Sequence, residues 1–315
     1  MFYPRPPPHP LAGIRAKLDR GDEHVRAYEQ CEHELMASAN RPDIGIAVRI
    51  DREQSRAILR VVRVDELPLT LPALIGDAVH NFRSALDHLV FELTFTDSAG
   101  GSRLPRGQTL ERTMFPDSDS LTNFEGIHVQ TRLLAGLTQK HRAQLKRFQP
   151  YRHRKRTTTT HPVRLLIDLS NYDKHRLVQP VLMCASDIYV EVLESEMRDC
   201  HPAANPDWRS DLVLGVPLEP ETEIASLSIE ITGPQPQMKV KGTKTLFVGF
   251  RNGEGVLDAL ERMGAYAREI VEFFAPDFDR PQAVKLRTVP RPTRISPRAS
   301  PPETEQTSGV VFAGE

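Results

Sequence analysis

One segment of the chain, residues 76–93, combines helical periodicity with side chains that could do acid–base chemistry. Steps of three and four residues place Asn81, Ser84 and His88 on one face of a helix, and His80, Ser84 and Asp87 along an adjacent stripe. Histidine alone titrates near neutral pH without perturbation. This polar strip could therefore supply a general acid or base.

The same strip also has a purely structural interpretation. Asp87 can pair with Arg83 one helical turn away, and the histidines can bind backbone or carboxylate partners on neighbouring helices. The functional interpretation rests on the number of hydrogen-bonding side chains beside a core seam, because each of them would need a partner if it were buried. Both interpretations stay open at this point.

The run from Arg83 to His88, Arg-Ser-Ala-Leu-Asp-His, resembles the Arg-x4-His motif of the HEPN superfamily. This superfamily of small helical domains includes ribonuclease toxins and RNA-processing effectors, and its motif lies on a long bundle helix. Residues 80–88, taken together with residues 171–176, also resemble a set of uncharacterised bacterial proteins, and that resemblance implies no activity.

The HEPN resemblance implies a metal-independent ribonuclease. Arg83 would contact the scissile phosphate, and His88 would assist attack by the RNA 2′-hydroxyl. Five residues turn a helix by about 140°, so the two side chains do not stack. In the family, the motif arginine and histidine act together in a cleft at a two-fold interface, although they do not stack on one helix face. The resemblance therefore implies a homodimer. Ser84 and the β-rich region 177–250 depart from the family pattern.

Two further groups extend the candidate site. Asp173 and His175 end a predicted helix, where basic side chains cap exposed carbonyls, or the two residues complete a pocket with the strip. Divalent ions accept the ligand types of His80, His88, Asp87, Asp173 and His175, but no His-x3-His or Glu-x-x-His spacing is present. A metal-binding bundle is thus a second alternative, and we expect no cofactor.

A basic segment follows residue 150. Its cations are Arg152, Arg154, Lys155 and Arg156, with aromatic side chains nearby. Positive charge with interleaved aromatics is the local composition of a single-stranded nucleic-acid contact. A solvated basic loop is the alternative interpretation.

Periodicity predicts the elements that must position these residues. Helical spacing appears in five segments, and β-branched runs mark a hairpin and a later group of strands. The predicted helices cover 11–38 with a break or bend near Gly21, 73–95, 128–148 and a short segment from Pro162, and a last helix covers 256–274 and is closed by Pro276. The predicted strands cover 44–50, 57–64, 178–183, 188–193, 212–216, 224–231 and 239–250.

These elements indicate an α+β fold in a single domain, residues 11–279. A helical bundle over 72–176 would pack beside a mostly antiparallel sheet over 177–250, with the closing helix at 256–274. Residues 1–10 and 280–315 are rich in proline and poor in apolar side chains, so we expect a disordered N-terminus and a disordered C-terminal tail.

Bulk composition limits the partners. The 315 residues carry 41 Lys+Arg and 42 Asp+Glu, so no overall field attracts nucleic acid or membranes. No apolar run reaches the length of a membrane span and no secretory signal is present, so we expect a cytoplasmic protein that does not bind membranes. Three scattered cysteines indicate neither disulfides nor a thiolate metal site.

The leading functional hypothesis is a HEPN-like RNA-binding protein or metal-independent ribonuclease of a bacterial stress or defence type. Its expected partners are RNA, a second copy of the chain and an antitoxin. The alternative is a non-enzymatic interaction or dimerisation module whose polar helix mediates the contact.

Overall fold

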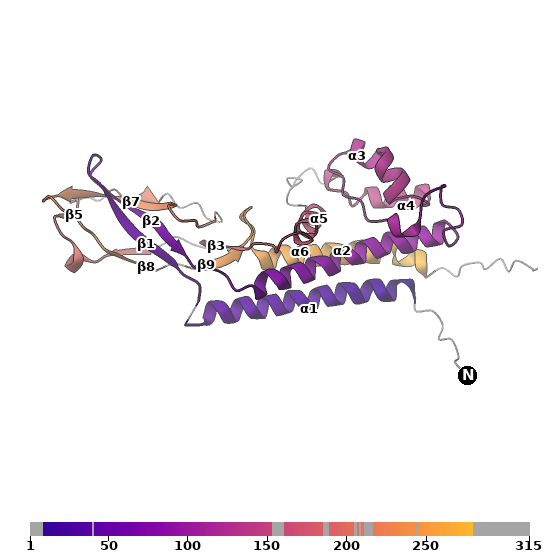
Figure 1. Ribbon diagram of the computed structural model, residues 1–315, viewed down its shortest axis with the longest axis horizontal. Helices are drawn as coiled ribbons and strands as arrows, with labels where there is room; N and C mark the ends of the chain where they lie inside the picture. Colours follow the sequence, from indigo (N-terminus) through magenta and orange to yellow (C-terminus); the bar gives the residue numbers. More distant parts are fainter. Residues whose placement is uncertain are drawn as a thin grey trace, which may run out of the picture. The chain divides into compact units, whose positions relative to one another are not determined.

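The computed structural model describes residues 9–39, 41–152, 161–184, 189–204, 207, 209–210, 217–243 and 245–279. Within them, helices and antiparallel strands occupy separate stretches of an α+β fold (Figure 1). The predicted disordered tail at 280–315, most of the predicted disordered segment 1–10 and the predicted strand at 212–216 lie outside these residues.

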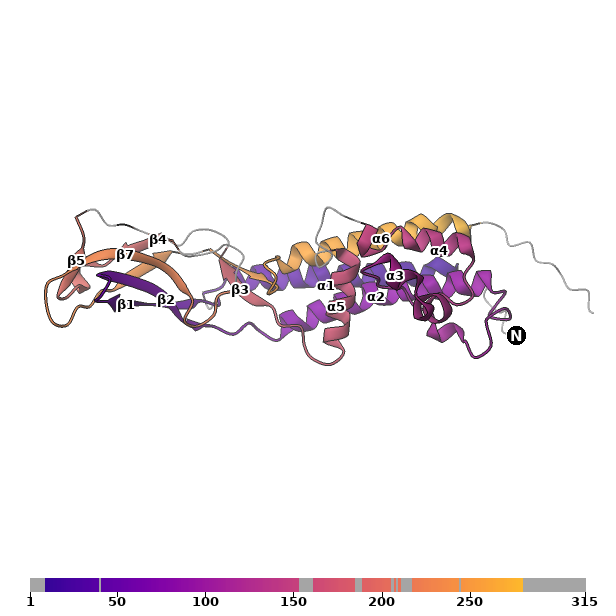
Figure 2. The same cartoon turned by 90° about the horizontal axis from the view of Figure 1, so that it is seen from above.

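Three long helices form the bundle: α1 (Pro10–Ala37), α2 (Thr70–Asp97) and α6 (Val256–Phe278). Each contacts the other two, and they lie side by side in both views (Figures 1 and 2). The sequence predicted all three helices but placed the bundle within 72–176. This placement of the bundle was wrong. Helical periodicity identifies the apolar face of a helix but does not indicate which other helix packs against that face.

Phe82 of α2 lies where the three long helices come closest together. A Cβ atom added to Gly21 of α1 would lie 2.3 Å from a ring carbon of Phe82, and one added to Gly264 of α6 would lie 2.7 Å from the ring. Phe82 itself is fully buried. The predicted interruption at Gly21 was wrong, because α1 continues through this residue and the missing side chain makes room for the aromatic ring.

The shorter helices differ from the prediction in one place. Instead of one helix over 128–148, a π-helix at Val129–Leu133 precedes α4 (Gln139–Lys146). Gly136, in the turn between the two segments, has a φ of +81°, a conformation that favours glycine. Thr138 then caps α4 by accepting a hydrogen bond from the backbone N–H of His141.

The remaining helices are α5 (Pro162–Asp173), which was predicted, and α3 (Leu121–Glu125). His161 precedes Pro162 and accepts a hydrogen bond from the N–H of Val163, which caps α5. The predicted end of α6 at residue 274, before Pro276, was wrong by about one turn. The helix continues to Phe278, since a proline in the last turn removes only one hydrogen bond of the ladder.

The hairpin predicted near the N-terminus is confirmed as β1 (Ile44–Asp51) and β2 (Arg56–Val64). It is not isolated, because β7 (Glu223–Ile231) pairs antiparallel with β2. Two short strands, β5 (Cys200–Pro202) and β6 (Arg209–Ser210), pair with β7. This five-stranded sheet has an apolar core of its own. Its most buried members are Ala57, Leu59, Val61, Ile224 and Leu227.

The other strands form two separate pairs among the described residues. β3 (Val181–Cys184) pairs with β9 (Leu246–Gly249), and β4 (Tyr189–Val192) pairs with β8 (Val240–Thr243). The prediction of one sheet over 177–250 was therefore wrong, and the predicted strand at 239–250 divides into β8 and β9. Strand propensity locates a strand, but packing against neighbours selects its partner.

None of the described helices combines the length and the apolar composition that a bilayer span requires.

The contact at Phe82 predicts an unusual response to Gly21→Ala. Alanine normally stabilises a helix interior by up to about 1 kcal/mol relative to glycine. Here the new methyl group would overlap the Phe82 ring, so we expect the free energy of unfolding to fall by about 1–3 kcal/mol. Chemical denaturation monitored by circular dichroism measures the change.

Gly13→Ala is the matched control, because Gly13 lies in the same helix with no atom within 4 Å of an added Cβ. It should leave stability unchanged or increase it. Equal effects of the two substitutions would contradict the packing of Phe82 against Gly21.

Candidate functional site

Helix α2 presents its polar side chains in two directions. The sides that face α1 and α6 bury its apolar residues. Arg83 and Asp87 lie on the side of the loop that contains Phe115, whereas His80 and His88 are exposed. The five-residue step of about 140° predicted from the sequence therefore separates Arg83 from His88 in the folded chain.

Arg83 and Asp87 form a set of hydrogen bonds with the backbone of Phe115. The Arg83 guanidinium donates to Asp87 over 3.1 Å from Nε and to the Phe115 carbonyl over 3.0 Å. The Phe115 N–H in turn donates to Asp87 over 2.9 Å. The ion pair predicted at i, i+4 is thus confirmed, and the same pair fastens the 115 loop to α2.

Burial dominates the electrostatics of this set. The Arg83 side chain is only 12% exposed and Asp87 is 30% exposed. Burial raises the pKa of Asp87, and the charge of Arg83 and the N–H of Phe115 act against this increase. The arginine that the HEPN resemblance assigns to phosphate binding already has an anion and a carbonyl as partners.

A second arginine pair lies next to the first. Arg164 of α5 donates to Asp117 over 3.0 Å and to Asp168 over 2.8 Å. Burial raises the pKa of Asp117, and Arg164 and Arg83 both act against this increase. Arg83 and Arg164 therefore both stabilise the 115–117 loop, which the sequence placed only in a polar connection.

A separate cluster forms where α5 meets the start of α2. A Cβ on Gly76 would lie 2.5 Å from a carboxylate oxygen of Asp173. The carboxylate therefore packs directly against the α2 backbone at Gly76, where no side chain intervenes. Burial and the nearby Asp77 raise the pKa of Asp173, while His80 and the N–H of Val178 lower it. Asp173 thus lies near Asp77 and His80 at the start of the strip, whereas the predicted pocket that would also include His175 stays a prediction.

The remaining members of the predicted strip are more peripheral. His175 is exposed beyond the end of α5. The Asn81 side chain donates to the Asp77 carbonyl over 2.8 Å, within its own helix. Ser84 is half-buried on the same side of α2 as His88.

The predicted nucleic-acid contact is described only at its first residue. Arg152 is exposed in the short 3-10 helix Pro150–Arg152. Arg154, Lys155 and Arg156 lie outside the described residues.

The metal hypothesis finds no support in the described part of the chain. No three histidine, cysteine, aspartate or glutamate side chains come together there as a group that could hold an ion. Asp87 faces Arg83 and Phe115, His80 lies near Asp173, and His175 is exposed elsewhere.

One polar cluster was missed by the sequence analysis. His141 of α4 is buried, with its Nδ1 2.7 Å from Asp97 at the end of α2 and its Nε2 3.4 Å from Asp277 near the end of α6. Burial opposes ionisation of Asp97, but hydrogen bonds from His141 and Thr138 lower its pKa. These residues are too far apart in the chain for any motif to reveal them, and they join the ends of three helices.

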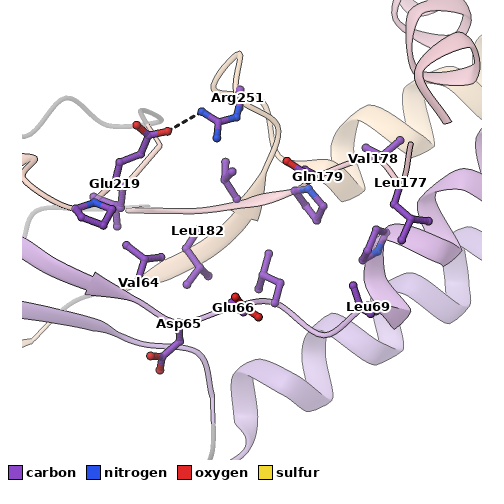
Figure 3. A pocket seen from close by; sticks show the side chains of 16 residues that line it. Val64, Asp65, Glu66, Leu69, Leu177, Val178, Gln179, Leu182, Glu219 and Arg251 are labelled. Carbon is purple, nitrogen blue, oxygen red and sulfur yellow. Dashed lines mark hydrogen bonds and ion pairs between the residues drawn. The ribbon is translucent and has the colours of Figure 1, made fainter. Parts of the chain in front are cut away.

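The sequence analysis also missed a pocket of about 580 Å³, here called the connection pocket (Figure 3). Its lining comes mainly from chain segments that connect helices to strands. Representative residues are Glu66, Leu69, Leu177, Leu182, Glu219 and Arg251. Its mostly apolar lining with a few charged groups is typical of ligand sites.

Comparison of the chain with protein-family models, with curated proteins and with solved structures finds no match.

The hydrogen-bonded set around Arg83 predicts a large cost for Asp87→Ala. This substitution leaves the buried guanidinium and the Phe115 N–H without their acceptor, so we expect the free energy of unfolding to fall by about 1–3 kcal/mol. Asp168→Ala removes the i, i+4 partner of Arg164 at a more exposed position and should cost no more than about 1 kcal/mol.

Thermal or denaturant unfolding of both variants makes the comparison. A loss for Asp87→Ala no larger than that for Asp168→Ala would show that the Arg83 set does not stabilise the fold.

Proposed function

We propose that this chain is a non-enzymatic interaction module that self-associates through one exposed face of α2. The observation that carries the proposal is a row of side chains at three- and four-residue steps that stays exposed or half-buried along the helix. We call this row the α2 stripe. It consists of Ala73, Asp77, His80, Ser84, His88, Phe91 and Phe95.

The chemistry of the α2 stripe suits a second copy of the same helix. The row follows the spacing of a helix–helix seam. Phe95 is 46% exposed and offers apolar surface that a partner would cover. In a two-fold antiparallel pair centred on Ser84, Asp77 of one copy would lie opposite Phe91 and within one helical turn of His88 of the other.

The surroundings of Arg83 favour this role over catalysis. The guanidinium is largely enclosed by Asp87 and the Phe115 carbonyl, and His88 lies on another face of α2. The Arg83–Asp87 pair instead explains why the strip carries charged residues beside a core seam.

Self-association predicts a concentration-dependent dimer that Ser84→Arg dissociates. The new guanidinium lies at the middle of the α2 stripe, where two copies would place like charges opposite each other. Light scattering after size-exclusion chromatography should show the mass of a dimer for the wild type and of a monomer for the variant.

Ser195→Arg is the control, because Ser195 is exposed and lies away from α2. It should remain dimeric. A monomeric wild type at high concentration would overturn the proposal, and a dimer that tolerates Ser84→Arg would place the interface elsewhere.

A second candidate is the HEPN-like RNA-binding protein or ribonuclease of a bacterial stress or defence system, with RNA and an antitoxin as partners. The observation that favours it is the exposed imidazole of His88 on a long bundle helix, five residues after Arg83. A general acid or base must reach its substrate, and His88 meets this requirement. The exposed Arg152 adds a cation for RNA contact.

This candidate predicts RNA cleavage that persists in EDTA and disappears in His88→Ala. His80→Ala is the matched control, since His80 is also an exposed imidazole of the α2 stripe. Gel analysis of mixed RNA incubated with each protein measures cleavage. Absence of cleavage by the wild type, or equal loss in both variants, would remove the ribonuclease candidate.

A further inference from the structure

We propose that the connection pocket binds a small organic cation with an apolar body. The pocket encloses about 580 Å³, within the volume range of small-molecule sites. Neither the α2 stripe nor Arg83 lines it, so this proposal does not depend on the proposed function.

The apolar part of the pocket can accept a hydrocarbon body. Leucine, valine and proline side chains make up most of the lining, and two leucines at its edge are unusually open to solvent: Leu69 is 73% exposed and Leu177 is 49% exposed. A bound apolar group would cover part of both. Burial of such surface contributes about 25 cal/mol per Å².

The charges around the pocket select a cation. Three carboxylates, those of Asp65, Glu66 and Glu219, line it together with one guanidinium, that of Arg251. Arg251 is paired with Glu219 over 2.6 Å on one side, and the two other acids lie on the opposite side (Figure 3). The only positive group of the described lining is therefore already neutralised.

Glu66 is the carboxylate best placed to bind the cation. Asp65 already accepts hydrogen bonds from Arg63 and from the backbone N–H of Asp43. Glu66 forms no ion pair with any described residue, and its side chain is exposed. A ligand could pair its ammonium or guanidinium group with Glu66 and place its hydrocarbon body among the leucines. Such a ligand would use both the charged part and the apolar part of the pocket.

A ligand there would also contact separate connections of the chain. Residues 65–69 join β2 to α2, residues 177–180 join α5 to β3, and Arg251 lies between β9 and α6. A ligand that bridges these connections binds only the folded chain, so it should raise the melting temperature of the protein.

Three probes of equal length test the charge preference: hexylammonium, hexanoate and neutral hexanol. We expect hexylammonium to bind about fivefold more tightly than hexanol, and hexanoate to bind more weakly than both, in titrations of the full chain followed by nuclear magnetic resonance. Shifted resonances should include those of residues 65–69 and 177–180. Preference for hexanoate, or no binding of any probe at millimolar concentration, would overturn the proposal.

Two variants separate the charge from the apolar body. Glu66→Gln should weaken hexylammonium binding about three- to fivefold and leave hexanol unchanged, whereas Leu69→Ala should weaken both. Glu53→Gln is the matched control, because Glu53 is exposed in the turn between β1 and β2 and does not line the pocket. Equal effects of Glu66→Gln and Glu53→Gln would refute the assignment of Glu66.

Discussion

The seating of Phe82 between Gly21 and Gly264 is the constraint on which the rest of the bundle depends. Two glycines on different helices leave room for one aromatic ring, and any side chain at either position would overlap it. This contact fixes how near α1 and α6 approach α2. It also fixes the rotation of α2 about its axis, because the side that carries Phe82 must point between the two other helices.

That rotation determines what the polar residues of α2 can do. With Phe82 directed inward, Arg83 and Asp87 point toward the 115 loop, His80 and His88 are exposed, and Ser84 is half-buried between them. One helix thus has a buried side, a side that anchors a loop and an exposed side. The hydrogen-bonding residues of the strip therefore point in two directions.

The two apolar cores of the chain explain where the connection pocket lies. The bundle core and the core of the five-stranded sheet are separate groups of buried residues, although β3 and β9 contribute Leu182 and Val248 to the bundle core. The chain passes between them through short connections rich in proline and acidic residues. Such segments cannot fill space as closely as packed side chains, and the pocket forms among them.

Features that depend on neighbours within one element could be predicted from the residues alone. These features are α1, α2, α5 and α6, the β1–β2 hairpin and the pair Arg83–Asp87, because helical periodicity, strand propensity and i, i+4 contacts are local properties. The partners of each helix and strand became known from the folded structure. The fit of Phe82 against two glycines, the pairing of β2 with β7, the Asp97–His141–Asp277 contacts and the connection pocket all join residues far apart in the chain. No local pattern records such contacts, because they form only when separate apolar faces pack together.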